Sequence, residues 1–164
     1  MTDEQSKLRS THIQALLENT QNREKFSLKL TVAGGFPGQA PYILLHIDGT
    51  GKASCKVDYA PADVHIDVKN QILEAKQVET LLRVIMNSDV LAIADEPFLF
   101  QPDSLTGLLE LEQGQYKRQF RFYADSHQAP ETLSSALRQV LNQVYLVGKD
   151  VAGIEIDPDE NFKP

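Results

Sequence analysis

The chain has 164 residues, a length typical of one domain or of one domain with short appendages. Hydrophobic residues make up 41% of the chain and charged residues 24%, so it can build a core without disulfide or metal staples. Its 16 basic and 23 acidic residues give a formal net charge of −7. This balance argues against nucleic-acid binding through phosphate contacts and against adhesion to an anionic membrane.

Cysteine content and the N-terminal residues bear on the compartment. The single cysteine, Cys55, excludes an internal disulfide and fits a reducing compartment. Residues 1–7 are polar and lack the basic and apolar regions of a signal peptide. No stretch reaches the roughly 18 apolar residues of a membrane-spanning helix. We therefore predict a cytoplasmic protein with no membrane partner.

The first part of the chain reads as a helix followed by two strands. Apolar residues near helical spacing predict a short helix over 5–19, within an N-terminal helical segment, 1–22. Alternation from Phe26 to Val32 predicts a half-buried strand, and the glycine- and proline-rich run 33–41 predicts a loop. The next strand, 42–47, is apolar on both faces, which predicts a central strand covered on both sides.

A hairpin and a further strand follow. Asp48-Gly49-Thr50-Gly51 is the strongest turn signal of the chain, and it should join strand 42–47 to a strand over 52–59. In this second strand Cys55 shares a face with other apolar residues, which favours a buried structural thiol over a nucleophile. Val64, Ile66 and Val68 then alternate with polar residues, which predicts another strand.

The second half contains two helices separated by a hairpin. Val78, Leu81, Leu82 and Ile85 have the spacing of an amphipathic helix that ends near residues 87–88. Residues 95–104 read as irregular, and residues 108–112 and 116–124 as a hairpin. Pro130 suits the first position of a last helix, whose apolar stripe runs over 133–144 and whose C-cap is expected near Gly148.

These elements predict an α+β fold: an open antiparallel sheet of about five to six strands, with two or three helices packed on one face. We expect one domain over 23–149 and an acidic, loosely ordered tail over 150–164. The tail contains five acidic residues and one lysine, a net charge of −4, which leaves −3 for the other 149 residues. Most of the acidity therefore belongs to the tail, and the domain is nearly balanced.

The glycine-rich loop is the first candidate contact site. Gly34, Gly35, Phe36 and Gly38 could form a ligand loop, but the sequence lacks a phosphate-binding lysine and a helix after the loop. A wide hairpin loop is the simpler interpretation. Phe36 on this loop and Phe98 in the polar segment 95–104 are candidate contacts for a protein partner, although Phe98 is expected more often in the core.

A repeated tripeptide raises a metal hypothesis. His46-Ile47-Asp48 and His65-Ile66-Asp67 each place a histidine and an aspartate on one strand face, so His46, His65 and Asp67 are candidate ligands. If strand 52–59 lies between them, the two histidines are two strand spacings apart. Strand alternation alone explains the repeat more simply, and no cofactor is expected.

Two further patterns have ordinary explanations. Asp48-Gly49-Thr50 lacks the directly adjacent hydroxyl residue of the aspartic-protease triplet, so it is interpreted as a turn. The basic and aromatic residues of 116–123 could stack on single-stranded nucleic acid, but a solvated sheet face fits the acidic composition better.

The order of these elements resembles a group of small uncharacterised bacterial α+β domains. The matching points are Gly34-Gly35-Phe36-Pro37-Gly38, the Asp48-Gly49 turn and the Leu81-Leu82 helix, within roughly residues 26–147. The resemblance implies the fold and brings no activity with it.

No catalytic constellation emerges from these residues. The first hypothesis is therefore a non-catalytic soluble module that binds a protein partner or a second copy of itself. The alternatives are a small-ligand or metal-binding protein, and an enzyme whose site is assembled from separated strands.

Overall fold

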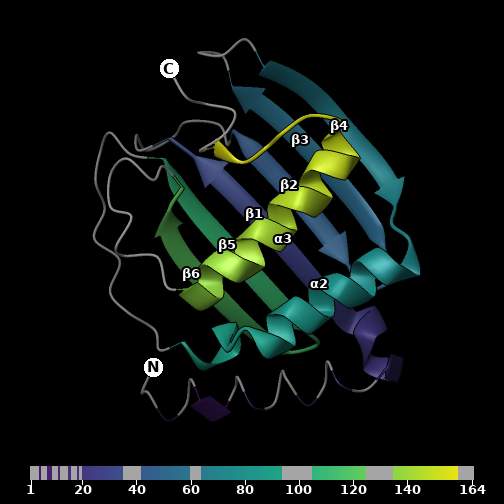
Figure 1. Ribbon diagram of the computed structural model, residues 1–164, viewed down its shortest axis with the longest axis vertical. Helices are drawn as coiled ribbons and strands as arrows, with labels where there is room; N and C mark the ends of the chain where they lie inside the picture. Colours follow the sequence, from purple (N-terminus) through teal and green to yellow (C-terminus); the bar gives the residue numbers. More distant parts are fainter. Residues whose placement is uncertain are drawn as a thin grey trace.

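The computed structural model describes residues 20–34, 42–59, 64–93, 105–124 and 135–158, together with Glu4, Lys7, Leu8, Thr11, Ala15 and Glu18, which are helical. The described strands form one six-stranded antiparallel sheet in the order β4-β3-β2-β1-β5-β6. The strands are β1 (Phe26–Ala33), β2 (Ile43–Asp48), β3 (Lys52–Tyr59), β4 (Val64–Ile72), β5 (Thr106–Gln113) and β6 (Tyr116–Tyr123). Two α-helices cross one face of this sheet (Figure 1). The predicted α+β class and open antiparallel sheet are confirmed.

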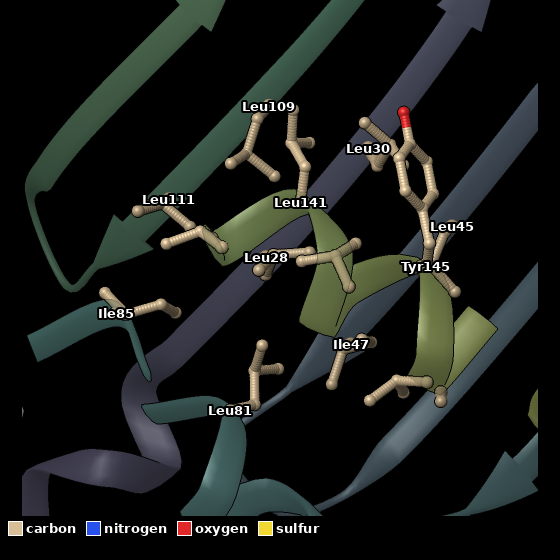
Figure 2. Packing of buried hydrophobic residues seen from close by; sticks show 14 of the residues in the cluster. Leu28, Leu30, Leu45, Ile47, Leu81, Ile85, Leu109, Leu111, Leu141 and Tyr145 are labelled. Atoms are coloured by element: carbon tan, nitrogen blue, oxygen red, sulfur yellow. The ribbon is translucent and has the colours of Figure 1, made fainter. Parts of the chain in front are cut away.

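The helices are α2 (Ala75–Asn87) and α3 (Ser135–Ala152), and two short 3-10 helices, η1 (Thr20–Lys25) and η3 (Val90–Ala92), precede β1 and follow α2. Most apolar residues of the strands and helices lie in the layer between helices and sheet, whereas Val68, Ile72 and Leu146 are exposed. Figure 2 shows this core, with labelled side chains from β1, β2, β5, α2 and α3 gathered between the layers. The helix spacing at Val78, Leu81, Leu82 and Ile85 is confirmed, because all four are buried.

The turn at Asp48 joins β2 to β3 as predicted. Asp48 Oδ1 accepts hydrogen bonds from Thr50 N at 2.9 Å, Thr50 Oγ1 at 2.6 Å and Lys52 N at 3.1 Å. These three donors lower the pKa of the Asp48 carboxyl, against the opposing effect of its partial burial. The side chain therefore holds the turn most tightly when it is ionised.

A polar contact joins the two helices. The Glu74 N–H donates to Gln77 Oε1 at 3.0 Å, at the start of α2. Gln77 Nε2 in turn donates to Asp150 Oδ2 at 3.0 Å, near the end of α3. The C-terminal end of α3 is therefore tied to the N-terminal end of α2.

Helix α3 does not end at Gly148 as predicted. It continues to Ala152, and Gly153, with a φ of 77°, ends it by donating its N–H to Lys149 O at 2.8 Å. Gly148 instead allows a close approach, because a Cβ there would lie 2.2 Å from Ile156 Cδ1 and 3.2 Å from Leu45 Cδ2. The C-terminal segment folds back so that Ile156 fills this position.

The residues after Gly148 therefore belong to the folded body as far as Pro158. Val151, Ala152, Ile156 and Pro158 are all buried. Helix and core packing thus continue into 150–158 of the expected tail, where three acidic residues obscured the apolar pattern that packs on α3. Residues 159–164 lie outside the described part of the chain, as do Pro130 and Leu133 of the predicted last helix.

Strand β2 departs from the prediction that both of its faces are covered. Ile43, Leu45 and Ile47 are buried beneath the helices, but Leu44 is only half-buried and His46 is exposed. Helices α2 and α3 lie on the same side of the sheet (Figure 1), so neither of them covers the side on which Leu44 and His46 lie. We call the other side of the sheet the open face.

Strand β4 contains an irregularity that the sequence pattern did not show. Cys55 faces Lys69 and Val57 faces Ile66, so β4 has one more residue than β3 between these pairs. Alternation would have placed Val68 on the buried face with Ile66. The bulge instead turns Lys69 toward the helices and leaves Val68 58% exposed.

Candidate functional site

The structure separates the two candidate histidines. Strand β3 lies between β2 and β4, and His46 faces Ser54, which faces Asn70. His65 lies farther along β4, opposite Asp58. The two histidines are thus two strand spacings apart across the sheet and displaced along it, too far for one metal ion to bind both.

His65 and Asp67 do come together. His65 Nε2 lies 3.2 Å from Asp67 Oδ1, and His65 Nδ1 lies 3.5 Å from Asp58 Oδ1. The side chains are exposed, so these contacts are weak ion pairs at most. Among the residues that the structure describes, no group of three histidines, cysteines or acidic residues is arranged to hold a metal ion.

The glycine-loop candidates fall mostly outside the described residues. Gly34 is half-buried and directly follows β1. Gly35, Phe36, Gly38 and Phe98 are among the residues that the structure does not describe. Their predicted role as contacts for a ligand or partner stays a prediction.

Cys55 lies within the core, as its strand face predicted. It is fully buried, and this burial raises the pKa of the thiol to about 11. A thiol held protonated beneath two helices does not act as a nucleophile. Cys55 therefore has a packing role.

Arg118 is a buried charge that the sequence reasoning placed on a solvated strand. It is only 2% exposed, and its guanidinium lies 5.1 Å from the centre of the Phe120 ring. Arg118 Nη1 donates to Leu91 O at 3.2 Å, and Nη2 donates to Ile93 O. Because a buried charge needs such partners, Arg118 ties β6 to η3. Residues two apart on a strand share a face, so the spacing of Arg118 from Phe120 and Phe122 could have indicated that Arg118 is buried.

On the open face of β5 and β6, a lysine forms ion pairs with two glutamates. Lys117 Nζ lies 2.9 Å from Glu110 Oε1 and 3.0 Å from Glu112 Oε1. The hydrogen bond from Lys117, with a second from Gln119, lowers the pKa of the Glu110 carboxyl against the effect of its partial burial. On this face Glu110 and Glu112 therefore balance the charge of Lys117.

The edge strand β4 carries the largest exposed apolar side chains of the described sheet. Ile72 is 68% exposed and Val68 is 58% exposed. Strand β4 pairs with β3 on one side, and no described strand pairs with its other side. We call residues 68–72, on the far side of the bulge, the β4 edge (Figure 1).

Sheet edges are usually protected by bulges or charged residues; on the β4 edge the bulge and Lys69 lie at one end, and residues 70–72 are uncharged. A lysine on an edge strand normally repels an approaching strand. Here Lys69 Nζ donates to Ala152 O at 3.0 Å, at the end of α3, and so stays on the helix side. The opposite edge, β6, presents Lys117, Gln119 and Arg121 on its open face. The two edges thus differ in chemistry, and only β4 offers an apolar surface.

No family model matches the chain, and no curated protein matches it significantly. Within the described part of the chain, no helix is long and apolar enough to span a membrane.

Proposed function

We propose that this protein is a non-catalytic interaction module of the cytoplasm that binds an extended protein strand along the β4 edge. The observation that carries the proposal is the exposure of Val68 and Ile72 beside an unpaired strand edge. An added strand would satisfy the outward backbone groups of β4, and its side chains would cover these two residues.

Other features of the described residues support a binding role over catalysis. Cys55 is buried and protonated, and Arg118 is engaged by backbone carbonyls. His65 is paired with exposed carboxylates at the surface of the sheet. The metal-binding alternative has less support than strand addition, because the strand order keeps His46 away from this pair.

Site-specific photo-cross-linking tests the proposal. A benzophenone amino acid is placed at position 72, or at position 146 as the matched control, in cells that produce the protein. Leu146 is 57% exposed and belongs to α3, in the helical layer and not in the sheet. We expect protein adducts from position 72, with the cross-linked peptide in an extended segment of the partner, and few from position 146. Equal labelling at both positions, or none at position 72, would contradict the proposal.

A further inference from the structure

We infer that the strand bound at the β4 edge is β4 of a second copy of this chain, antiparallel and centred on Asn70. This inference rests on the proposed function and names its partner. Two six-stranded sheets would then join edge to edge into one continuous sheet, with both helical layers on the same side.

The bulge sets which side chains share a face along the β4 edge. Residues opposite each other in a sheet point to the same side. Asn70 faces Ser54 and Ile72 faces Lys52, which lie on the open face of β3. By alternation, Val68, Asn70 and Ile72 point to the open face, whereas Lys69 and Gln71 point toward the helices.

Only some registers of a symmetric strand pair place residues that point to the same side of the sheet opposite each other. In an antiparallel pair of identical strands, the two-fold axis must pass through a residue, because an axis between residues would oppose side chains of different faces. Within the β4 edge, the central axis positions are Lys69, Asn70 and Gln71. The choice among the three follows from charge and apolar contact.

The register centred on Asn70 is the one that the side chains favour. Centring on Lys69 would place two lysines directly opposite each other, which is destabilising. Centring on Gln71 would put Val68 opposite the charged Glu74. Centring on Asn70 pairs Val68 of each copy with Ile72 of the other and Lys69 with Gln71, without any like charges directly opposed within residues 68–72.

This pairing buries the apolar residues that the isolated chain exposes. Val68 of each copy would pair with Ile72 of the other on the open face, which gives two apolar pairs, one on either side of the two Asn70 side chains. Because only five residues of each strand pair, the contact is small and the association should be weak and concentration-dependent.

The oligomeric state tests the apolar part of this inference. Sedimentation velocity over a wide concentration range should show a monomer–dimer equilibrium for the full chain. Ile72→Lys and Val68→Lys should each weaken dimerisation by about tenfold or more, since each loses one large apolar contact per copy. Leu146→Lys is the matched control for adding a lysine at an exposed apolar position, and it should leave the equilibrium unchanged. Circular dichroism checks that each variant is folded.

Symmetric cysteine cross-linking tests the register. In Asn70→Cys, the two cysteines would face each other across the axis, within the Cα separation of about 4.4–6.8 Å that a disulfide needs. Diamide should therefore oxidise the two thiols to an intermolecular disulfide. Ser54→Cys, one strand inward on the same face, would leave its two cysteines about three strand spacings, or ~14 Å, apart and uncross-linked. The native Cys55 is buried and does not compete.

The outcomes separate this inference from the proposed function. Two results together would support a second copy as the partner. Dimerisation should be lost in Ile72→Lys, and a disulfide should form at position 70 and not at position 54. A chain that stays monomeric at every concentration, or cross-links equally at both positions, overturns the inference. If position 72 still forms photo-adducts with another protein in that case, the proposed function survives and only the identity of the partner is wrong.

Discussion

At the scale of single residues, a few polar side chains secure the positions where the chain changes direction. Asp48 collects three donors at the β2–β3 turn, and Lys69 binds the carbonyl of Ala152 at the end of α3. At a turn or a helix end, some backbone N–H and C=O groups have no partner within the secondary structure. These two side chains form hydrogen bonds with such groups in place of water. Turn and helix ends therefore depend on identifiable side chains.

Asp48→Asn should destabilise the fold at neutral pH and not in acid. The folded state lowers the pKa of this carboxyl below its ordinary value of 3.8, so it favours the ionised form. The stabilisation is present above that pH and is lost as the pH falls through the folded-state pKa. Because Asp48 is partly exposed, we expect a loss of about 0.5–1 kcal/mol at pH 7.

Urea denaturation at several pH values measures this difference. The gap between wild type and Asp48→Asn should close once the pH lies below the folded-state pKa. Asp67→Asn is the control, because the Asp67 side chain is 93% exposed. A pH-independent gap at position 48 would show that the charge of the carboxylate does not contribute.

At the scale of elements, two irregular features decide how the sheet meets its surroundings. The bulge in β4 reverses the faces of residues 68–72 relative to residues 64–66. On the other edge, Arg118 reaches from β6 to the carbonyls of η3. One feature exposes apolar residues, and the other buries a charge. A simple rule of apolar residues inside and polar residues outside predicts neither feature, and both depend on contacts between residues distant in sequence.

Arg118→Ala should be strongly destabilising, whereas Arg121→Ala should not. Removing the Arg118 guanidinium leaves the carbonyls of Leu91 and Ile93 without these donors and leaves a cavity beside Phe120. The expected loss is about 2–4 kcal/mol. Arg121 lies on the same strand but is exposed, and its loss should cost less than about 0.5 kcal/mol.

Thermal denaturation compares the two arginine variants, and hydrogen exchange locates the effect. Amides of η3 and the end of α2 should exchange faster in Arg118→Ala. Equal stability of the two variants would show that the buried guanidinium does not tie β6 to η3.

At the scale of the whole molecule, the folded body extends beyond the last helix. The core runs from Phe26 in the first strand to Ile156 in the C-terminal segment. Lys149 Nζ also lies 3.2 Å from Glu155 Oε2, which holds this segment against α3. The sheet, helices α2 and α3 and the C-terminal segment therefore share one core.

Gly148→Ala should destabilise the protein although alanine favours helix by about 1 kcal/mol. The added methyl would lie 2.2 Å from Ile156 Cδ1, so Ile156 would be displaced from its buried position. We expect a net loss of about 1–2 kcal/mol. Ile156→Val removes that methyl, so the cost of Gly148→Ala should be smaller in the Ile156→Val background.

A double-mutant cycle measured by chemical denaturation gives the coupling between the two positions. Additive effects would show that the C-terminal segment does not pack at Gly148. They would also restore the domain end near residue 148 that the sequence suggested.

Local sequence pattern was enough to predict strands, helices and their buried faces wherever alternation or helical spacing was regular. Phe26–Val32 and Val78–Ile85 follow their predicted patterns, because local periodicity reports which side faces the core. The Asp48 turn was equally local. Alternation puts Arg118 on the same face as Phe120, but a solvated sheet face was expected for the basic residues of 116–123.

Features that depend on residues distant in sequence became visible only in the folded chain. The bulge in β4 follows from its pairing with β3, and Gly148 acts as a close-approach site because Ile156 folds back onto it. The separation of His46 from His65 follows from the strand order. Such contacts join residues far apart along the chain, and local pattern carries no information about which of these pairs will meet. The exposed β4 edge, on which the proposed function depends, is therefore a property of the assembled sheet.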